Sequence, residues 1–221
     1  MPKSRLQGID LGLYLVTDRP LCRGGDLEVV VRRAVSGGAT VVQLREKQAS
    51  TREFVDLARR LKAMLDPLRI PLIINDRIDV ALASGAAGAH VGQSDMRPED
   101  ARRLLGPDAI LGLSVENRDQ ASEAESPAMQ GIVDYLGVGP ILPTATKTDT
   151  SEPWGVDGFA ALAKTSALPL VAIGSVNLSN ATELIRSGAA GIAVVSAIVA
   201  ADDPEQAAKD LAHAVAQGRG D

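Results

Sequence analysis

The chain has 221 residues, of which 45% are hydrophobic, 23% charged and 2% aromatic, and its formal net charge is −5. A chain of this length buries roughly 70–75% of its unfolded surface, so its core needs no disulfide or structural metal. The charge balance and the scattered basic residues argue against a nucleic-acid-binding surface. The single cysteine, Cys22, excludes an internal disulfide and suits a reducing compartment.

Neither the first residues nor the longest uncharged run indicates export or membrane insertion. The segment Met1 to Gln7 lacks the apolar stretch of a signal peptide. The run Ser187 to Ala201 is rich in Gly and Ala and shorter than the roughly 18–20 apolar residues of a membrane span. We therefore expect a cytoplasmic protein without a membrane or nucleic-acid partner.

Short apolar runs recur along the whole chain and predict its strands. Each run is too short for a typical helix and lacks the polar alternation of a half-exposed strand, which indicates parallel strands covered on both faces. No linker divides them, so we expect one domain over residues 1–221, with short flexible ends at about 1–9 and 217–221. The runs are Leu13 to Val16, Thr40 to Leu44, Leu72 to Ile74, Ala89 to Val91, Ile110 to Leu113, Tyr135 to Val138, Leu170 to Ile173 and Ile192 to Val195.

Helical stripes of apolar residues lie between these runs. Ser50 followed by Glu53 predicts a capping box at the start of the second helix. Three tetrapeptides that begin at Ser36, Ser84 and Ser187 each precede a strand, and their glycines fit a left-handed helix C-cap. The clearest stripes are Leu27, Val30, Val31 and Ala34, then Phe54, Leu57, Ala58 and Leu61, and later Ala208, Leu211, Ala212 and Val215.

The alternation of strands and helices predicts a single α/β domain, a (β/α)₈ TIM barrel with parallel strands. The three related tetrapeptides support a repeated βα architecture. A doubly wound open sheet is the alternative, and it is weaker because no Gly-x-Gly-x-x-Gly sequence follows the first strand. In a barrel, the active site forms where the strands end at their carboxyl side.

Gln43, Arg45 and Lys47 alternate at the end of the second strand and would point one way from an extended chain. An amide and two cations on one side indicate an anionic ligand. A solvated charged loop, with Glu46 paired to a neighbour, accounts for the same residues. The position at the mouth of the barrel favours the functional interpretation.

Asp76 and Asp95 end adjacent strands, where two carboxylates could hold a Mg²⁺ ion that bridges to substrate phosphates. The same spacing allows each aspartate to cap the helix that follows it, so both interpretations stand. Zinc is disfavoured because the only histidines are His90, inside a strand, and His213, in the last helix. For both histidines a structural role is the default.

The loop after the sixth strand and the ends of the last two strands suit phosphate groups. The segment Thr144 to Thr148 carries hydroxyl donors and the ammonium of Lys147, which suit a phosphate or diphosphate, although an ordinary surface loop remains the alternative. Gly174 and Ser196 stand where barrels often bind phosphate through backbone N–H groups. A simple turn also accounts for Gly174, because one glycine alone does not exclude it.

Five segments together resemble thiamine-phosphate synthases, and the match covers nearly the whole chain. Each motif alone is weak, but five in order at the ends of successive predicted strands make a specific signal. The segments are Tyr14 to Asp18, Val42 to Lys47, Ile74 to Arg77, His90 to Asp95 and Gly137 to Lys147.

The resemblance implies a transferase that joins 4-amino-5-hydroxymethyl-2-methylpyrimidine diphosphate to a thiazole phosphate, or its carboxylated form, to give thiamine phosphate and diphosphate. It implies a dissociative alkyl transfer assisted by Mg²⁺, with the metal held by Asp76 and Asp95, and small-molecule substrates and a homo-oligomer as partners. The catalytic residues that it implies are Arg45, Lys47, Ser114 and Lys147. The pyrimidine diphosphate would contact Gln43, Leu44, Arg45, Glu46, Lys47, Asn75, Ser114 and Lys147, and the thiazole phosphate would contact Thr144, Ala145, Thr146, Gly174, Val195 and Ser196.

One departure from the family and three other functions bear on this interpretation. The family often has a second glycine after Gly174, where Ser175 stands here. A thiazole tautomerase-like relative would need a general acid or base and no diphosphate clamp. A non-catalytic barrel that binds thiamine precursors is a second alternative, and the retained aspartates and cations favour catalysis over it. A sugar-phosphate isomerase or lyase is supported by fold alone.

Overall fold

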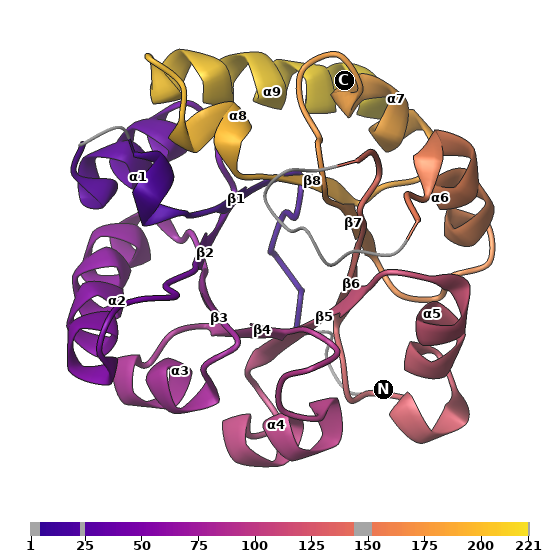
Figure 1. Ribbon diagram of the computed structural model, residues 1–221, viewed down its shortest axis with the longest axis horizontal. Coiled ribbons are helices and arrows are strands. Elements are labelled where there is room, and N and C mark those ends of the chain that lie inside the picture. The colour runs from indigo at the N-terminus through magenta and orange to yellow at the C-terminus, as the bar shows by residue number, and fades with distance from the viewer. Residues whose placement is uncertain (1–4, 23–24, 144–151, 221) are drawn as a thin grey trace.

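The computed structural model describes residues 5–22, 25–143 and 152–220. Eight parallel strands form a closed barrel in chain order, and β8 pairs with β1 to complete the ring. Helices surround this ring (Figure 1). The closed ring confirms the predicted TIM barrel and excludes the open sheet. The strands are β1 (Leu13–Val16), β2 (Val41–Leu44), β3 (Leu72–Asn75), β4 (Gly88–Val91), β5 (Ile110–Val115), β6 (Tyr135–Val138), β7 (Leu170–Ala172) and β8 (Gly191–Val194).

Asp26, Ser50, Asn117 and Asp203 each accept a backbone N–H at the start of a helix. The predicted capping box at the start of α2 is confirmed, because the Ser50 hydroxyl accepts from the Glu53 N–H and the Glu53 carboxylate accepts from the Ser50 N–H. None of the described helices is long and apolar enough to cross a membrane. The α-helices are α1 (Leu27–Ser36), α2 (Thr51–Leu65), α3 (Ile78–Ser84), α4 (Pro98–Leu105), α5 (Arg118–Ala124), α6 (Gly155–Ala163), α7 (Ala181–Arg186), α8 (Ser196–Val199) and α9 (Pro204–Arg219).

The glycines after the helices follow the predicted left-handed cap only in part. Gly85 caps α3 with φ +69°, as predicted. The prediction is wrong for Gly37, whose φ is −83°. A Cβ on Gly37 would lie 2.3 Å from the carbonyl oxygen of Glu205, so this glycine lets α9 pack closely against the end of α1. Gly38 takes the left-handed conformation instead, with φ +108°.

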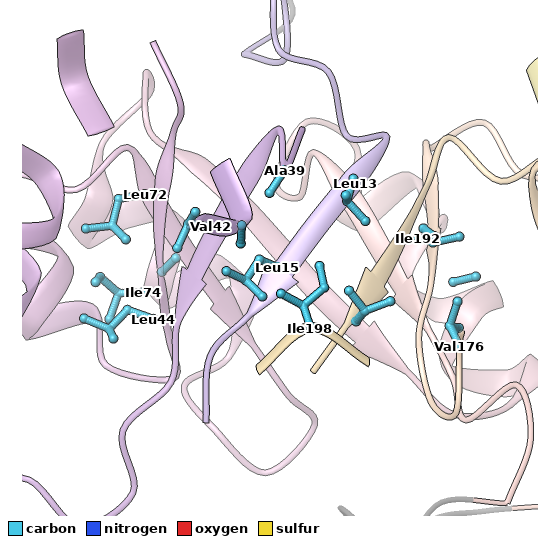
Figure 2. Packing of buried hydrophobic residues seen from close by; sticks show 14 of the residues in the cluster. Leu13, Leu15, Ala39, Val42, Leu44, Leu72, Ile74, Val176, Ile192 and Ile198 are labelled. Carbon is cyan, nitrogen blue, oxygen red and sulfur yellow. The ribbon is translucent and has the colours of Figure 1, made fainter. Parts of the chain in front are cut away.

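Side chains alternate along each strand between two apolar clusters. Leu13 and Leu15 point outward and pack between β1 and the helices (Figure 2). Tyr14 and Val16 point into the barrel and pack with residues such as Ile73 of β3. Both faces of every strand are therefore covered, which explains why the sequence shows continuous apolar runs instead of alternation.

Charged contacts hold both ends of the part of the chain that the structure describes. The Arg5 guanidinium donates to the Asp134 carboxylate at 3.0 Å, and Asp134 also accepts from Arg102 at 2.8 Å. At the other end, α9 continues to Arg219, which pairs with Asp10 at 2.6 Å. Arg219 thereby ties the last helix to the segment that enters β1.

Replacing Gly88 by alanine should destabilise the barrel, because the added Cβ would lie 1.9 Å from the carbonyl oxygen of Ile110. We expect a loss of about 1–3 kcal/mol in the free energy of unfolding. Gly158, which lies in α6, is the matched control, since an added Cβ would have its nearest neighbour at 3.8 Å. Gly158→Ala should raise the free energy of unfolding by about 0.5–1 kcal/mol. Urea unfolding measures both, and equal midpoints would contradict the assigned packing.

Candidate active site

A cavity of about 900 Å³ opens at the carboxyl ends of the strands. Residues from all eight strands or from the segments that follow them line it, as expected when parallel strands close into a barrel. Most of the site residues selected from the sequence meet here. The lining includes Gln43, Arg45, Lys47, Asn75, Asp76, Asp95, Ser114, Gly174, Val195 and Ser196.

Two of the selected residues lie elsewhere and four lie outside the described residues. The Leu44 side chain packs in the cluster between the barrel and the helices, because it alternates with Gln43 along β2 (Figure 2). The Glu46 carboxylate accepts a hydrogen bond from Arg19 at 3.0 Å. Thr144, Ala145, Thr146 and Lys147 fall in the segment that the structure leaves undescribed.

Two cations on the β2 side of the cavity are each paired with a carboxylate. The Arg45 guanidinium donates to Asp18 at 2.7 Å, and its backbone N–H donates to Thr17 Oγ1 at 3.0 Å. The Lys47 ammonium donates to Asp76 at 2.6 Å. Both side chains are partly exposed, with 28% of Arg45 and 55% of Lys47 accessible, so both can turn to a bound anion. Gln43, Arg45 and Lys47 share one cavity, as the alternation predicts.

Asp76 and Asp95 interact with each other and cap neither of the following helices. The N-cap residues of α3 and α4 are Arg77 and Arg97, and neither helix has a side-chain cap, so the capping interpretation is wrong. Asp95 instead accepts from the Gly92 N–H at 2.8 Å. Burial raises the pKa of Asp95, and the charge of Asp76 raises it further.

This carboxylate pair has the donor chemistry of a magnesium site. Among the described residues, no group of three or more His, Cys, Asp or Glu side chains is arranged to hold a metal. Mg²⁺ commonly uses only one or two protein carboxylates together with substrate phosphates, so Asp76 and Asp95 suffice. Two adjacent carboxylates that repel each other would be relieved by a divalent cation, and Lys47 supplies one positive charge there already.

A chain of hydrogen bonds forms the floor of the cavity. Gln43 Nε2 donates to the Tyr14 hydroxyl at 2.9 Å, and the hydroxyls of Tyr14 and Tyr135 lie 2.7 Å apart. His90 contacts Tyr135 through Nδ1 at 3.0 Å and Ser114 through Nε2 at 2.9 Å. The default structural role for His90 is therefore incomplete, because its side chain also lines the cavity.

The floor carries no charge near neutral pH. Burial lowers the pKa of His90 to about 4, against the opposing effect of Asp95. Burial raises the pKa of Tyr14 to about 12, and it holds that of Tyr135 well above its usual value. Cations and carboxylates gather at the mouth, whereas neutral donors and acceptors lie below. This arrangement suits a ligand with an anionic tail and an uncharged polar ring.

Sequence reasoning missed the two tyrosines as site residues, although a signal was present. They are the only tyrosines of the chain. Each has a polar tip in an otherwise aliphatic strand, where a buried hydroxyl requires a partner.

The ends of β7 and β8 form the opposite wall. A Cβ on Gly174 would lie 2.6 Å from Pro140 Cα, and its φ is +94°, so both close packing and the turn require glycine here. Ser175 also adopts a left-handed conformation, with φ +55°, which would cost a glycine nothing. Its hydroxyl donates to the Pro143 carbonyl at 2.6 Å. Val195 and Ser196 complete this wall at the start of α8.

Known proteins are similar to this chain in both sequence and fold. The model of the family described as thiamine monophosphate synthase matches residues 13–198. The thiamine-phosphate synthase of Albidiferax ferrireducens is 54% identical over 94% of this chain and 92% of its own. That of Leptospira biflexa is 50% identical over 89% and 93%. The solved thiamine phosphate pyrophosphorylase from Pyrococcus furiosus superposes with a TM-score of 0.85 at 36% identity, over 95% of this chain and 97% of that one. The chain therefore belongs to the thiamine monophosphate synthase family.

Proposed function

We propose that this protein is a thiamine-phosphate synthase, which transfers a pyrimidine-methyl group from its diphosphate to a thiazole phosphate. The observation that carries the proposal is the division of one cavity into a charged mouth and a neutral polar floor. Arg45, Lys47 and the aspartate pair suit a diphosphate, and Gln43 and Ser114 suit an aminopyrimidine ring. The identity to thiamine-phosphate synthases over most of the chain supports the same reaction.

In this reaction the bond between the pyrimidine methylene carbon and the diphosphate oxygen breaks, and its electron pair leaves with the diphosphate. The thiazole nitrogen then forms a bond to that carbon. Arg45 and Lys47 line the cavity where they can stabilise the growing negative charge, together with Lys147 of the undescribed segment. The carbon and the nitrogen react directly, so no side-chain nucleophile is needed.

The remaining residues bind and orient the two substrates. Gln43, Asn75 and Ser114 would hold the pyrimidine, and Gly174, Val195 and Ser196 would hold the thiazole phosphate, together with Thr144, Ala145 and Thr146 of the undescribed segment. Asp76 and Asp95 would hold Mg²⁺, which neutralises charge on phosphate oxygens when bound. The family resemblance also assigns Leu44 and Glu46 to the pyrimidine diphosphate, although neither is among the residues that line the cavity.

Product formation tests the proposal directly. The purified protein is given the pyrimidine diphosphate and the thiazole phosphate, once with Mg²⁺ and once with EDTA. We expect thiamine phosphate and diphosphate in equal amounts with Mg²⁺ and none with EDTA. Binding of either substrate without product would indicate a non-catalytic barrel that recognises thiamine precursors. Product at the same rate in EDTA would remove Mg²⁺ from the mechanism.

The same proposal leads to expectations for the domain, the compartment and the oligomeric state of the enzyme. The barrel uses elements from Leu13 to Arg219, which supports one domain over residues 1–221. The single cysteine, Cys22, is buried and free, which suits action in the cytoplasm. The family resemblance leads us to expect a homo-oligomer, and sedimentation equilibrium of the full chain checks this by giving a mass above that of one chain.

A further inference from the structure

The hydrogen-bond chain at the cavity floor has a defined direction. Gln43 donates its amide N–H to Tyr14, so the Tyr14 hydroxyl donates its own hydrogen to Tyr135. Tyr135 in turn donates to His90 Nδ1, which accepts in the neutral ring when Nε2 carries the hydrogen. His90 Nε2–H then donates to the Ser114 oxygen. Each group in this direction gives one hydrogen and accepts one.

The two ends of the chain face the cavity with opposite character. Because the Gln43 N–H points to Tyr14, its carbonyl oxygen is the acceptor left for a ligand. Because the Ser114 oxygen accepts from His90, its O–H is the donor left for a ligand. The chain thereby joins an acceptor on β2 to a donor on β5 across the barrel.

Reversing the chain requires all five groups to change together. The Gln43 amide would have to rotate by half a turn, both tyrosine hydroxyls and the Ser114 hydroxyl would have to turn, and His90 would have to exchange its tautomer. The reversal would also move the Gln43 N–H group off the Tyr14 hydroxyl, from which Nε2 lies 2.9 Å. The orientation of the Gln43 amide therefore sets the direction of the whole chain.

The barrel interior is shaped to hold this chain. Tyr14 and Tyr135 are each 1% exposed, so their hydroxyls need hydrogen-bond partners inside the barrel. Gly112 leaves room for the rings of Tyr135 and His90, because a Cβ there would lie 2.2 Å from the Tyr135 ring and 2.3 Å from His90 Nδ1. A Cβ on Gly137 would similarly lie 3.0 Å from His90 Cε1. Two glycines at these strand positions preserve the Tyr135 to His90 contact.

We infer that Tyr14, Tyr135 and His90 are positioning residues that make the site specific for a 4-aminopyrimidine over its 4-oxo counterpart. An exocyclic amine donates to the Gln43 carbonyl, and an unprotonated ring nitrogen accepts from the Ser114 hydroxyl. The 4-oxo ring offers the opposite pattern, an exocyclic acceptor and a ring N–H donor. It binds well only if the whole chain reverses. The inference rests on the proposed function, since it takes Gln43 and Ser114 as contacts of the pyrimidine.

Competitive inhibition separates recognition from chemistry. The probes are the monophosphates of the 4-amino pyrimidine and of its 4-oxo counterpart, which lack the diphosphate leaving group. Each is titrated against the diphosphate substrate, and the ratio of the two inhibition constants reports the discrimination. For the unaltered protein we expect the amino compound to bind about 10–100-fold more tightly, the usual cost of mismatched buried hydrogen bonds.

Tyr135→Phe cuts the middle of the chain and frees its two ends to adjust separately. We expect the discrimination ratio to fall to about threefold or less, as only single groups then have to reorient. Tyr14→Phe cuts the adjacent link and should lower the ratio similarly. The double variant should do no more than either single one, because groups that act as a unit are non-additive. Melting temperatures confirm that each variant is folded.

Ile73→Val is the matched packing control. Ile73 lies inside the same barrel, pairs in register with Gln43 and is 1% exposed, but it has no polar group. This variant should keep the ratio of the unaltered protein. A merely structural role for the tyrosines would weaken both inhibitors equally and leave the ratio unchanged, which would overturn the inference.

The outcomes for the proposed function and for the inference are distinct. An unaltered protein that makes thiamine phosphate but binds both probes equally would overturn the inference and leave the function standing. Product formation together with an unchanged ratio in Tyr135→Phe and Tyr14→Phe would do the same. A protein that forms no product and binds neither probe would refute the proposed function itself.

Discussion

Arg45→Ala is expected to lower kcat/KM by about 10²–10³-fold, the usual effect of removing one group that stabilises transition-state charge. Arg45 lines the cavity and holds its guanidinium at the mouth through Asp18. The melting temperature should change little, because the side chain is 28% exposed and belongs to neither apolar cluster. Steady-state kinetics and thermal unfolding of the same preparation measure the two effects.

Two further variants show whether the loss of activity in Arg45→Ala comes from the lost charge at the cavity. Arg45→Lys keeps the charge but loses the planar donor pair, so its activity should lie between those of the unaltered protein and the alanine variant. Arg32→Ala removes an exposed cation from α1, away from the cavity lining, and should retain full activity. A fall in melting temperature that accounts for the lost activity of Arg45→Ala would make Arg45 a structural residue. For Lys147, in the undescribed segment, the family resemblance predicts the same loss on replacement by alanine.

The fold could be predicted from the sequence because parallel strands covered on both faces are continuous apolar runs. Every predicted strand is confirmed to within two residues at each end. The largest difference is in β5, which continues to Val115 although the apolar run stops at Leu113. Ser114 interrupts the run because it points into the cavity, where a polar group is needed. Strand ends are therefore least predictable at the site itself.

The two sides of a strand also explain which site residues could be found. Gln43, Arg45 and Lys47 follow the period of two and all line the cavity, whereas Leu44 and Glu46 alternate with them and have other partners. A period within one segment is visible in the sequence.

The floor chain depends on closure of the barrel, which no local pattern reveals. Tyr14 and Tyr135 are 121 residues apart in the chain, yet their hydroxyls lie 2.7 Å from one another. The choice between a metal site and helix caps for Asp76 and Asp95 needed coordinates for the same reason. The spacing allowed both, and only the N-cap positions, which Arg77 and Arg97 occupy without a side-chain cap, excluded the caps.

The aspartate pair should lower the stability of the fold without Mg²⁺ and raise it with Mg²⁺ bound, and Asp95→Asn should separate these two effects. Without metal, the unaltered protein keeps Asp95 partly buried beside Asp76, and burial first and the charge of Asp76 second raise the pKa of Asp95. A raised pKa means that folding disfavours the ionised form, so at neutral pH a neutral side chain should stabilise the fold. In EDTA, we expect Asp95→Asn to melt at a higher temperature than the unaltered protein.

With Mg²⁺ and diphosphate present, the order should reverse. Ligands that bind only the folded state stabilise it more the more tightly they bind, so the unaltered protein should gain more than Asp95→Asn. Asp76→Asn should likewise raise the Mg²⁺ concentration for half-maximal activity by about tenfold or more, since even residues that only orient metal ligands cost 10–100-fold in affinity. Asp79→Asn is the control, because Asp79 pairs with Arg77 and does not line the cavity.

Calorimetric titration of Mg²⁺ in the presence of diphosphate measures the same affinity without turnover. The Asp79 variant should match the unaltered protein in the titration and in the rise of melting temperature that Mg²⁺ and diphosphate cause. If Asp76→Asn and Asp95→Asn also match it, the two carboxylates do not bind the metal. Their closeness would then serve only to place Lys47, whose ammonium lies 2.6 Å from Asp76. A loss of Mg²⁺ affinity in both aspartate variants, and not in Asp79→Asn, would instead establish the pair as the magnesium ligands. Placement of Lys47 would not explain a loss in Asp95→Asn, because Asp95 hydrogen-bonds to the Gly92 N–H and interacts with Lys47 through charge alone.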